Sequence, residues 1–167
     1  ELFPEDFQGG VLYSSLKNKR IYMHINVENA ATSAERTKVE MDARKSLMRI
    51  TQALKKMPGL ERLRVSRFAD ECGVRETYRL VGRETVTAAD YIRGWVYDDA
   101  VCYSFYPIDR HVPTGIEQVF LQDGIVPTIP YGALIPKGSD KLLAAGRCIS
   151  GDADANSAYR VQATCMA

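Results

Sequence analysis

Residues 142–167, LLAAGRCISGDADANSAYRVQATCMA, combine residue types that can hold an anion. The apolar run 142–145 predicts a short buried strand, and Gly146 lets the backbone turn tightly or approach a ligand closely. A helical pattern follows, with Asp154 or Asn156 as the expected N-cap. The N–H groups and dipole of a helix N-terminus favour negative charge. An ordinary strand, loop and capped helix remains the simpler interpretation. One face of the expected helix carries Ala158, Val161 and Cys165.

The N-terminal third predicts a hairpin and one long helix. Residues 11–27 alternate apolar and polar side chains around a polar turn at 17–19, which is typical of two paired strands. Apolar residues then recur at helical spacing from Ala34 to Met57. Thr32 or Ser33 can cap this helix, and Pro58–Gly59 ends it.

The remaining patterns predict further strands and a second short helix. TYRLVGRETV (77–86), AVCYSFYPI (100–108) and PTIPYGALIP (127–136) favour strands. A capping-box-like start at Thr87, with Asp90 in place of Glu, predicts a helix through Trp95. The fold class is therefore α+β (mixed α/β): a largely antiparallel sheet, one long helix and a C-terminal strand and helix.

Composition limits the classes of function. With 167 residues, 46% of them hydrophobic, the chain can form one folded domain. A net charge of +1 provides no general attraction for nucleic acid, and no apolar stretch is long enough to cross a bilayer. Four scattered cysteines indicate buried, reduced thiols, and two histidines without a ligand motif argue against a metal site.

Arginines gather in residues 61–86, interleaved with acidic residues. Arg75 and Arg79 can bind a carboxylate, or they can pair with Glu76, Glu84 or Asp70, which this alternation favours. His111 is either a proton-transfer group or a structural hydrogen-bonding histidine, because histidine is the residue type that titrates near neutral pH.

Three blocks carry a resemblance to a known family. IPYGALIPKGSDKLLAAGRCISGDADANSAYRVQATCMA (129–167) closely resembles the C-terminal flavin-binding segment of a family of bacterial FAD-dependent oxidoreductases. CGVRETYRLVGRETVTAADY (72–91) and DDAVCYSFYPIDRH (98–111) look like two internal segments of the same family. Residues 1–60 match only loosely.

The resemblance implies roles for individual residues. Gly146 would pass beside the ribityl chain and pyrophosphate of FAD. Arg147 stands where many related flavoproteins carry an acid, so phosphate or a neighbouring carboxylate is its expected partner. Asp152 is expected to cap the helix or face solvent. Asn156, Ser157 and Ala158 would face the pyrimidine edge of the flavin, where the helix dipole stabilises negative charge on the reduced ring.

For the substrate, the resemblance implies a small polar or carboxylate-bearing molecule. His111 and Arg160 are the candidate catalytic residues, and Arg75 and Arg79 the candidate substrate-binding residues. The expected division is a substrate-side domain, 1–135, and a partial FAD-binding segment of a Rossmann-like domain, 136–167.

The resemblance also implies that the sequence is an internal piece of a longer protein, because the family's GxGxxG phosphate loop does not occur in it. The chain alone is therefore expected to bind FAD weakly and to be inactive. We further expect a cytoplasmic location, no nucleic-acid or membrane partner, and dimerisation through exposed apolar surface. The alternative is a stand-alone interaction domain whose arginine-rich face binds an anionic partner.

Overall fold

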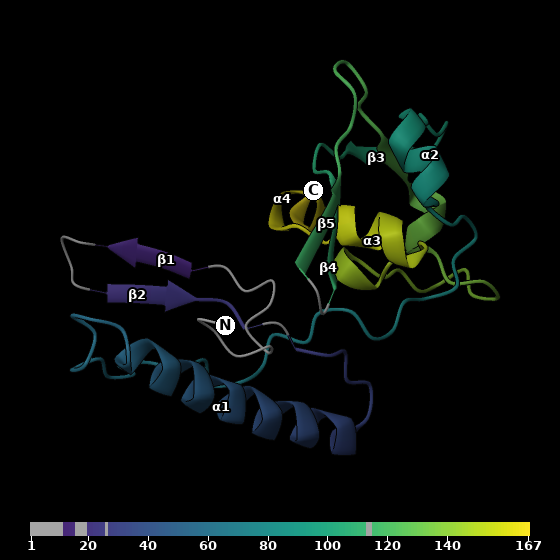
Figure 1. The fold of residues 1–167 in the computed structure, drawn as a ribbon. Helices are drawn as coiled ribbons and strands as arrows, with labels where there is room; N and C mark the ends of the chain where they lie inside the picture. Colours follow the sequence, from purple (N-terminus) through teal and green to yellow (C-terminus); the bar gives the residue numbers. More distant parts are fainter. Residues whose placement is uncertain (1–11, 16–19, 26, 113–114) are drawn as a thin grey trace. The chain divides into compact units, whose positions relative to one another are not determined.

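The computed structural model describes residues 12–15, 20–25, 27–112 and 115–167 (Figure 1). The chain divides into two compact units. The first comprises Glu1–Thr77 with His111–Ile116, and the second comprises Tyr78–Arg110 with Glu117–Ala167. Small antiparallel sheets and one long helix make up the α+β class that the sequence predicts.

The first unit contains the predicted hairpin. β1 (Leu12–Ser15) pairs antiparallel with β2 (Arg20–Met23), in a register that places Leu12 opposite Met23. The predicted turn at 17–19 lies outside the described residues. The sequence alternation continues to Val27, but β2 ends at Met23, which pairs with the first described residue of β1, Leu12. The predicted length of this strand is therefore wrong.

Helix α1 (Ser33–Lys55) confirms the long helix. Thr32 is its N-cap, and Glu35 completes a reciprocal capping box: the Thr32 Oγ1 accepts from the Glu35 N–H, and the Glu35 carboxylate accepts from the Thr32 N–H. The sequence analysis names Thr32 as one of two candidate caps but does not predict this capping box. The buried face follows the 3.6-residue period and consists of Val39, Ala43, Ser46, Ile50 and Leu54.

The chain after α1 returns to that helix. The Cys72 N–H donates to the Glu40 carboxylate, which also pairs with Arg44 one turn along. The Arg44 guanidinium lies 5.1 Å from the centroid of the Phe68 ring. These contacts fasten residues 68–72 to the middle of α1.

The second unit is built around short elements. α2 (Ala88–Arg93) has Thr87 as its N-cap, as the sequence predicts. It ends at the left-handed Gly94, φ 72°, and therefore does not extend through Trp95 as predicted. β3 (Ala100–Tyr103) pairs antiparallel with β6 (Thr128–Pro130), and β4 (Ile108–Val112) pairs with β5 (Gly115–Val119). The 3-10 turns η2 (Tyr131–Leu134) and η3 (Gly146–Cys148) precede α3 (Ala153–Tyr159) and α4 (Gln162–Met166).

One apolar cluster forms the core of this second unit. It joins α2, α3 and the strands that flank them. Its fully buried members are Val86, Tyr91, Ile108, Ile129, Ala133, Ile149, Ala155, Ala158 and Tyr159.

The prediction of a strand at 77–86 is wrong. This segment hydrogen-bonds alternately with two different neighbours, so no continuous ladder forms. Leu80 and Val86 donate their N–H groups to the carbonyls of Cys148 and Ser150, at 2.9 and 3.2 Å. Between them, Arg83 and Glu84 donate to residues 135 and 132.

Close packing at Gly82 explains this local path. A Cβ atom there would lie 2.6 Å from the Ser150 Cβ atom and 2.8 Å from the Glu84 carbonyl oxygen. Only glycine allows the three chain segments to approach this closely. Among the described residues, no helix is both long and apolar enough to cross a bilayer.

Candidate functional site

The Gly146–Arg147–Cys148 turn lies at the centre of the predicted site. Gly146 has φ 81°, which is the left-handed region, and a Cβ built on it meets no atom within 4 Å. The backbone at Gly146 therefore borders open space that a ligand can enter. The Arg147 side chain is exposed beside it, while the Arg147 carbonyl accepts a 3.0 Å hydrogen bond from the Asn156 Nδ2 atom.

The segment before this turn differs from the prediction. Residues 142–145 are not a buried strand, and the side chains of Leu142 and Leu143 are 58% and 55% exposed. A strand requires a ladder of backbone bonds, and in the described part of the chain no ladder forms along this run. Its Ala144 N–H donates to the Leu134 carbonyl at 2.9 Å.

Asp152 positions the helix that follows. One carboxylate oxygen accepts from the Ala155 N–H at 2.8 Å and caps α3, and the other accepts from the Ala88 N–H at 2.7 Å, at the start of α2. The expectation that Asp152 caps the helix is confirmed. The expectation of Asp154 or Asn156 as the N-cap is wrong, because the chain becomes helical one residue after Asp152.

The expected single closing helix is two short helices. Val161 is extended, with φ −83° and ψ 156°, so α3 ends at Tyr159 and α4 begins at Gln162. The Arg160 guanidinium at this break donates to the Asp109 carbonyl at 3.2 Å. Arg160 is thereby held at the end of α3, between the two helices.

The three predicted flavin-facing residues of α3 are buried. Asn156 is 1% exposed, and its Oδ1 atom lacks a hydrogen-bond partner in the described part of the chain. The Ser157 hydroxyl accepts from the Asp109 N–H at 3.0 Å and donates to the Asp154 carbonyl at 2.7 Å. Ala158 belongs to the apolar core. Asn156 thus has an unused acceptor, whereas Ser157 is fully engaged in tying α3 to β4.

The predicted substrate-side residues lie in two different units. Arg79 belongs to the second unit, where its Nε donates to the Gly151 carbonyl at 3.0 Å. Arg75 is exposed in the first unit, and His111 is an exposed residue of β4 that also belongs to it. The second unit therefore contains Arg79, Arg147, Asn156 and Arg160, whereas Arg75 and His111 belong to the first unit.

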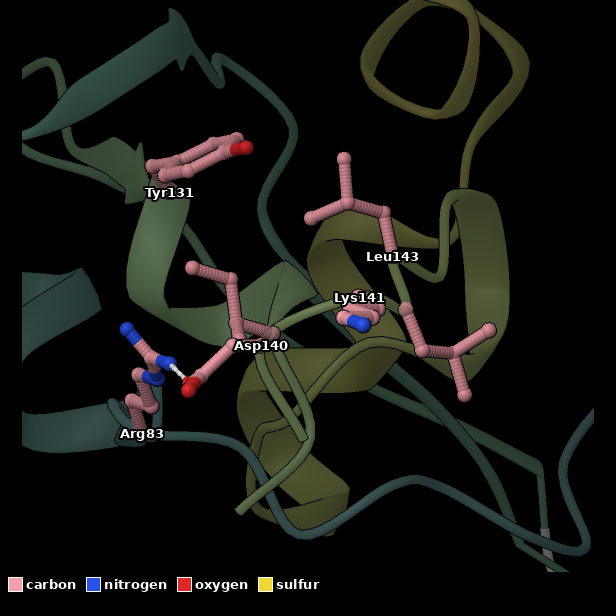
Figure 2. Close-up of a pocket in the computed structure, with 7 residues that line it drawn as sticks. Arg83, Tyr131, Asp140, Lys141 and Leu143 are labelled. Atoms are coloured by element: carbon pink, nitrogen blue, oxygen red, sulfur yellow. Dashed lines mark hydrogen bonds and ion pairs between the residues drawn. The ribbon is translucent and has the colours of Figure 1, made fainter. Parts of the chain in front are cut away.

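A cavity of about 620 Å³ lies beside this region, and sequence reasoning did not find it. An ion pair between Arg83 and Asp140 borders it, with Tyr131, Lys141 and Leu143 around the same space (Figure 2). Ile135 and Leu142 complete the lining. The only sequence signal was indirect: a polar turn, 137–141, before an apolar run.

The titrating groups of the second unit have structural partners. Burial, with the nearby Asp90 carboxylate, raises the pKa of Tyr97 to about 12. Burial also raises the pKa of Tyr91, whose hydroxyl lies 2.6 Å from the Ser104 Oγ atom and donates to the Tyr106 carbonyl at 2.8 Å. Both phenols are neutral at physiological pH. The described residues contain no group of three or more acidic, histidine or cysteine side chains that could hold a metal ion.

The comparison with protein families identifies the class. The family model described as FAD dependent oxidoreductase matches residues 4–167. The chain belongs to this family of flavin-dependent oxidoreductases. No curated protein and no solved structure matches the chain.

The residues at the turn fit part of an FAD molecule. Gly146 borders open space, Arg147 presents an exposed guanidinium that suits phosphate, and Asn156 holds a buried acceptor without a donor. That atom is enclosed by the protein, so a buried water molecule would satisfy it.

Proposed function

We propose that this chain provides one side of the FAD site of a flavin-dependent oxidoreductase that acts on a small polar or carboxylate-bearing molecule. The observation that carries this proposal is the open backbone of Gly146 next to the exposed Arg147, within a chain that belongs to the family throughout residues 4–167. Residues 136–167 would form the flavin-contacting segment, and residues 1–135 the substrate side.

Each residue of the turn has a distinct task. Gly146 lets the backbone approach the cofactor without a side chain in the way. Arg147 binds the pyrophosphate through guanidinium N–H donors. Asn156 holds the turn in place, because its Nδ2 donates to the Arg147 carbonyl. Bound FAD supplies the hydride acceptor for the substrate.

The substrate side rests on arginines and a histidine. Arg79 and Arg160 are oriented by backbone carbonyls, which keeps two guanidinium groups near the 146–160 region. We propose that they bind the carboxylate of the substrate. For the first unit, we propose Arg75 as a substrate-binding residue and His111 as a proton-transfer group, the roles that the family resemblance implies. We also propose a reducing, cytoplasmic environment, which suits a chain with four free cysteines.

Titration with FAD, followed by NMR of the ¹⁵N-labelled chain, tests the cofactor site. The sequence contains no GxGxxG loop, so we expect weak binding that needs millimolar FAD, and no turnover by this chain alone. The backbone signals of residues 146–148 and the side-chain amide of Asn156 should shift. Riboflavin, which lacks the pyrophosphate, should shift them less, and Arg147→Gln should remove the difference between the two ligands.

A matched glycine controls for backbone strain. Gly138 has φ 82° and equally open surroundings, so Gly138→Val and Gly146→Val strain the backbone alike. Only Gly146→Val should abolish the FAD-induced shifts. Equal loss in both variants, or no shift in residues 146–148 at saturating FAD, would overturn the proposed site.

A further inference from the structure

Three of the four cysteines gather in the second unit. Cys102 lies on β3, Cys148 in η3 and Cys165 in α4, and all are free thiols. η3 and α4 are in contact, and each contains a single cysteine. Negative charge on Cys148 acts on Cys165, and negative charge on Cys165 acts on Cys102. Cys165 therefore interacts electrostatically with both other thiols.

These thiols differ in their access to solvent. Cys148 is exposed, whereas Cys165 and Cys102 are partly buried. Burial raises the pKa of Cys165, and the nearby Arg147 guanidinium opposes this effect. A dissolved oxidant therefore reaches Cys148 first, and Cys165 is the neighbouring thiol on the contacting helix.

Each of the two sulfur atoms makes only a weak hydrogen bond to a nearby backbone carbonyl. The Cys148 Sγ donates to the Ala145 carbonyl at 3.5 Å, and the Cys165 Sγ donates to the Tyr159 carbonyl at 3.6 Å. Thiols are weak hydrogen-bond donors, so rotation about the Cα–Cβ bond of either cysteine would cost little hydrogen-bond energy. Disulfides join Cα atoms about 4.4–6.8 Å apart, a separation found between chain segments in contact. The break at Val161 leaves α4 as a short helix that can adjust.

We propose that Cys148 and Cys165 form a redox-active pair that closes to a disulfide when the exposed Cys148 thiolate attacks a low-molecular-weight disulfide, such as glutathione disulfide. The Cys148 thiolate displaces one glutathione thiolate and forms a mixed disulfide. The Cys165 thiolate then attacks the Cys148 sulfur and releases the second glutathione thiolate. The two protein thiols are oxidised and one glutathione disulfide is reduced to two glutathiones, with the two thiol protons passing to the released thiolates or to water.

Closure would link η3 to α4. Because η3 contains Gly146 and Arg147, the bridge would fix the turn of the proposed cofactor site. The proposal itself does not depend on flavin, since it concerns thiols that react in the chain alone.

Tryptic mapping of the natively folded chain tests the pair. Trypsin cleaves after Arg147 and Arg160, so Cys148 and Cys165 fall in separate peptides, 148–160 and 161–167. Cys102 and Cys72 fall in two others, 94–110 and 68–75. After incubation with glutathione disulfide and before alkylation, the intact chain should be lighter than the reduced chain by the mass of two hydrogen atoms. The free thiols are then alkylated before digestion. Peptides 148–160 and 161–167 should be joined.

Serine variants distinguish this pair from the other thiols. Cys148→Ser and Cys165→Ser should each abolish the joined peptide, whereas Cys72→Ser and Cys102→Ser should retain it. Three outcomes would each overturn the proposal. They are a disulfide between Cys102 and Cys165, a glutathione mixed disulfide that persists on Cys148, and a Cys148–Cys165 disulfide that forms only in urea. If a serine variant does not fold, the tryptic peptide map of the unaltered chain still shows which two cysteines are joined.

Discussion

Asp152 connects the start of α3 with the start of α2, and its removal tests whether one carboxylate fastens both helices. In Asp152→Ala the Ala155 and Ala88 N–H groups lose their acceptors, which lie at 2.8 and 2.7 Å. Apolar packing of the neighbouring Val86 and Ala155 remains in place. The change therefore isolates two charge-assisted hydrogen bonds.

The magnitude follows from these two bonds. Loss of an N-cap costs about 1 kcal/mol. Loss of a hydrogen bond to a charged group costs about 1.5–3 kcal/mol. Asp152 is half-buried, so water replaces part of each bond. We therefore expect Asp152→Ala to lower the free energy of unfolding by about 2–3 kcal/mol.

Urea unfolding followed by circular dichroism measures this loss, and Asp154→Ala is the matched control. Asp154 lies in the same first turn, but its carboxylate makes an exposed ion pair with Arg110 at 3.2 Å. Such pairs contribute about 0–1 kcal/mol. Asp152→Asn should fall between the two, because an amide oxygen still caps the helix while its NH₂ group cannot accept from Ala88. If Asp152→Ala proves no worse than Asp154→Ala, apolar packing alone holds α2 and α3.

Two further changes test packing and charge. A Cβ on Gly151 would overlap the hydroxyl of the buried Tyr159, so Gly151→Ala should lower the free energy of unfolding by about 1–3 kcal/mol. Gly73 is the control, because a Cβ there meets no atom within 4 Å. In the same urea assay, Gly73→Ala should leave the free energy of unfolding unchanged or raise it. The hydrogen bond from the Cys72 N–H, and secondarily the one from Arg44, lowers the pKa of Glu40 below its usual 4.5. The ionised Glu40 carboxylate therefore stabilises the fold above pH 4.5. This stabilisation is lost as the pH falls through the lowered pKa. Unfolding between pH 3 and 7 should show Glu40→Gln less stable than the unaltered chain near neutrality, with a gap that narrows in acid; a constant gap would contradict the assignment.

The features predicted well from the sequence are those set by local chemistry. Thr87 begins α2 because a threonine oxygen satisfies a free N–H group of the first turn, at Asp90. α1 follows from apolar spacing and from the end signal at 58–59. Each of these signals acts within a few residues, so it can be recognised without knowledge of distant contacts.

The features predicted wrongly depend on distant partners. Residues 77–86 and 142–145 both have strand-like composition, yet a strand forms only where a neighbour offers a matching ladder. Cys148 was expected to be a core thiol, but η3 leaves it exposed. In the candidate site, the sequence could identify Gly146 as a turn residue from its residue type alone. It could not predict the hydrogen bond between the Asp109 N–H and the Ser157 hydroxyl, because these residues are far apart in sequence.

The alternating bonds of residues 80–86 have a consequence for how the second unit opens. Leu80 and Val86 are bound to residues 148–150, while Arg83 and Glu84 are bound to residues 132–135. No part of this segment can leave one neighbour without straining its bonds to the other. The amide protons of Leu80, Glu84, Val86 and Ser150 should therefore exchange with solvent deuterium at a common rate, in a single opening event. These contacts span long stretches of chain, so they should also form late in folding.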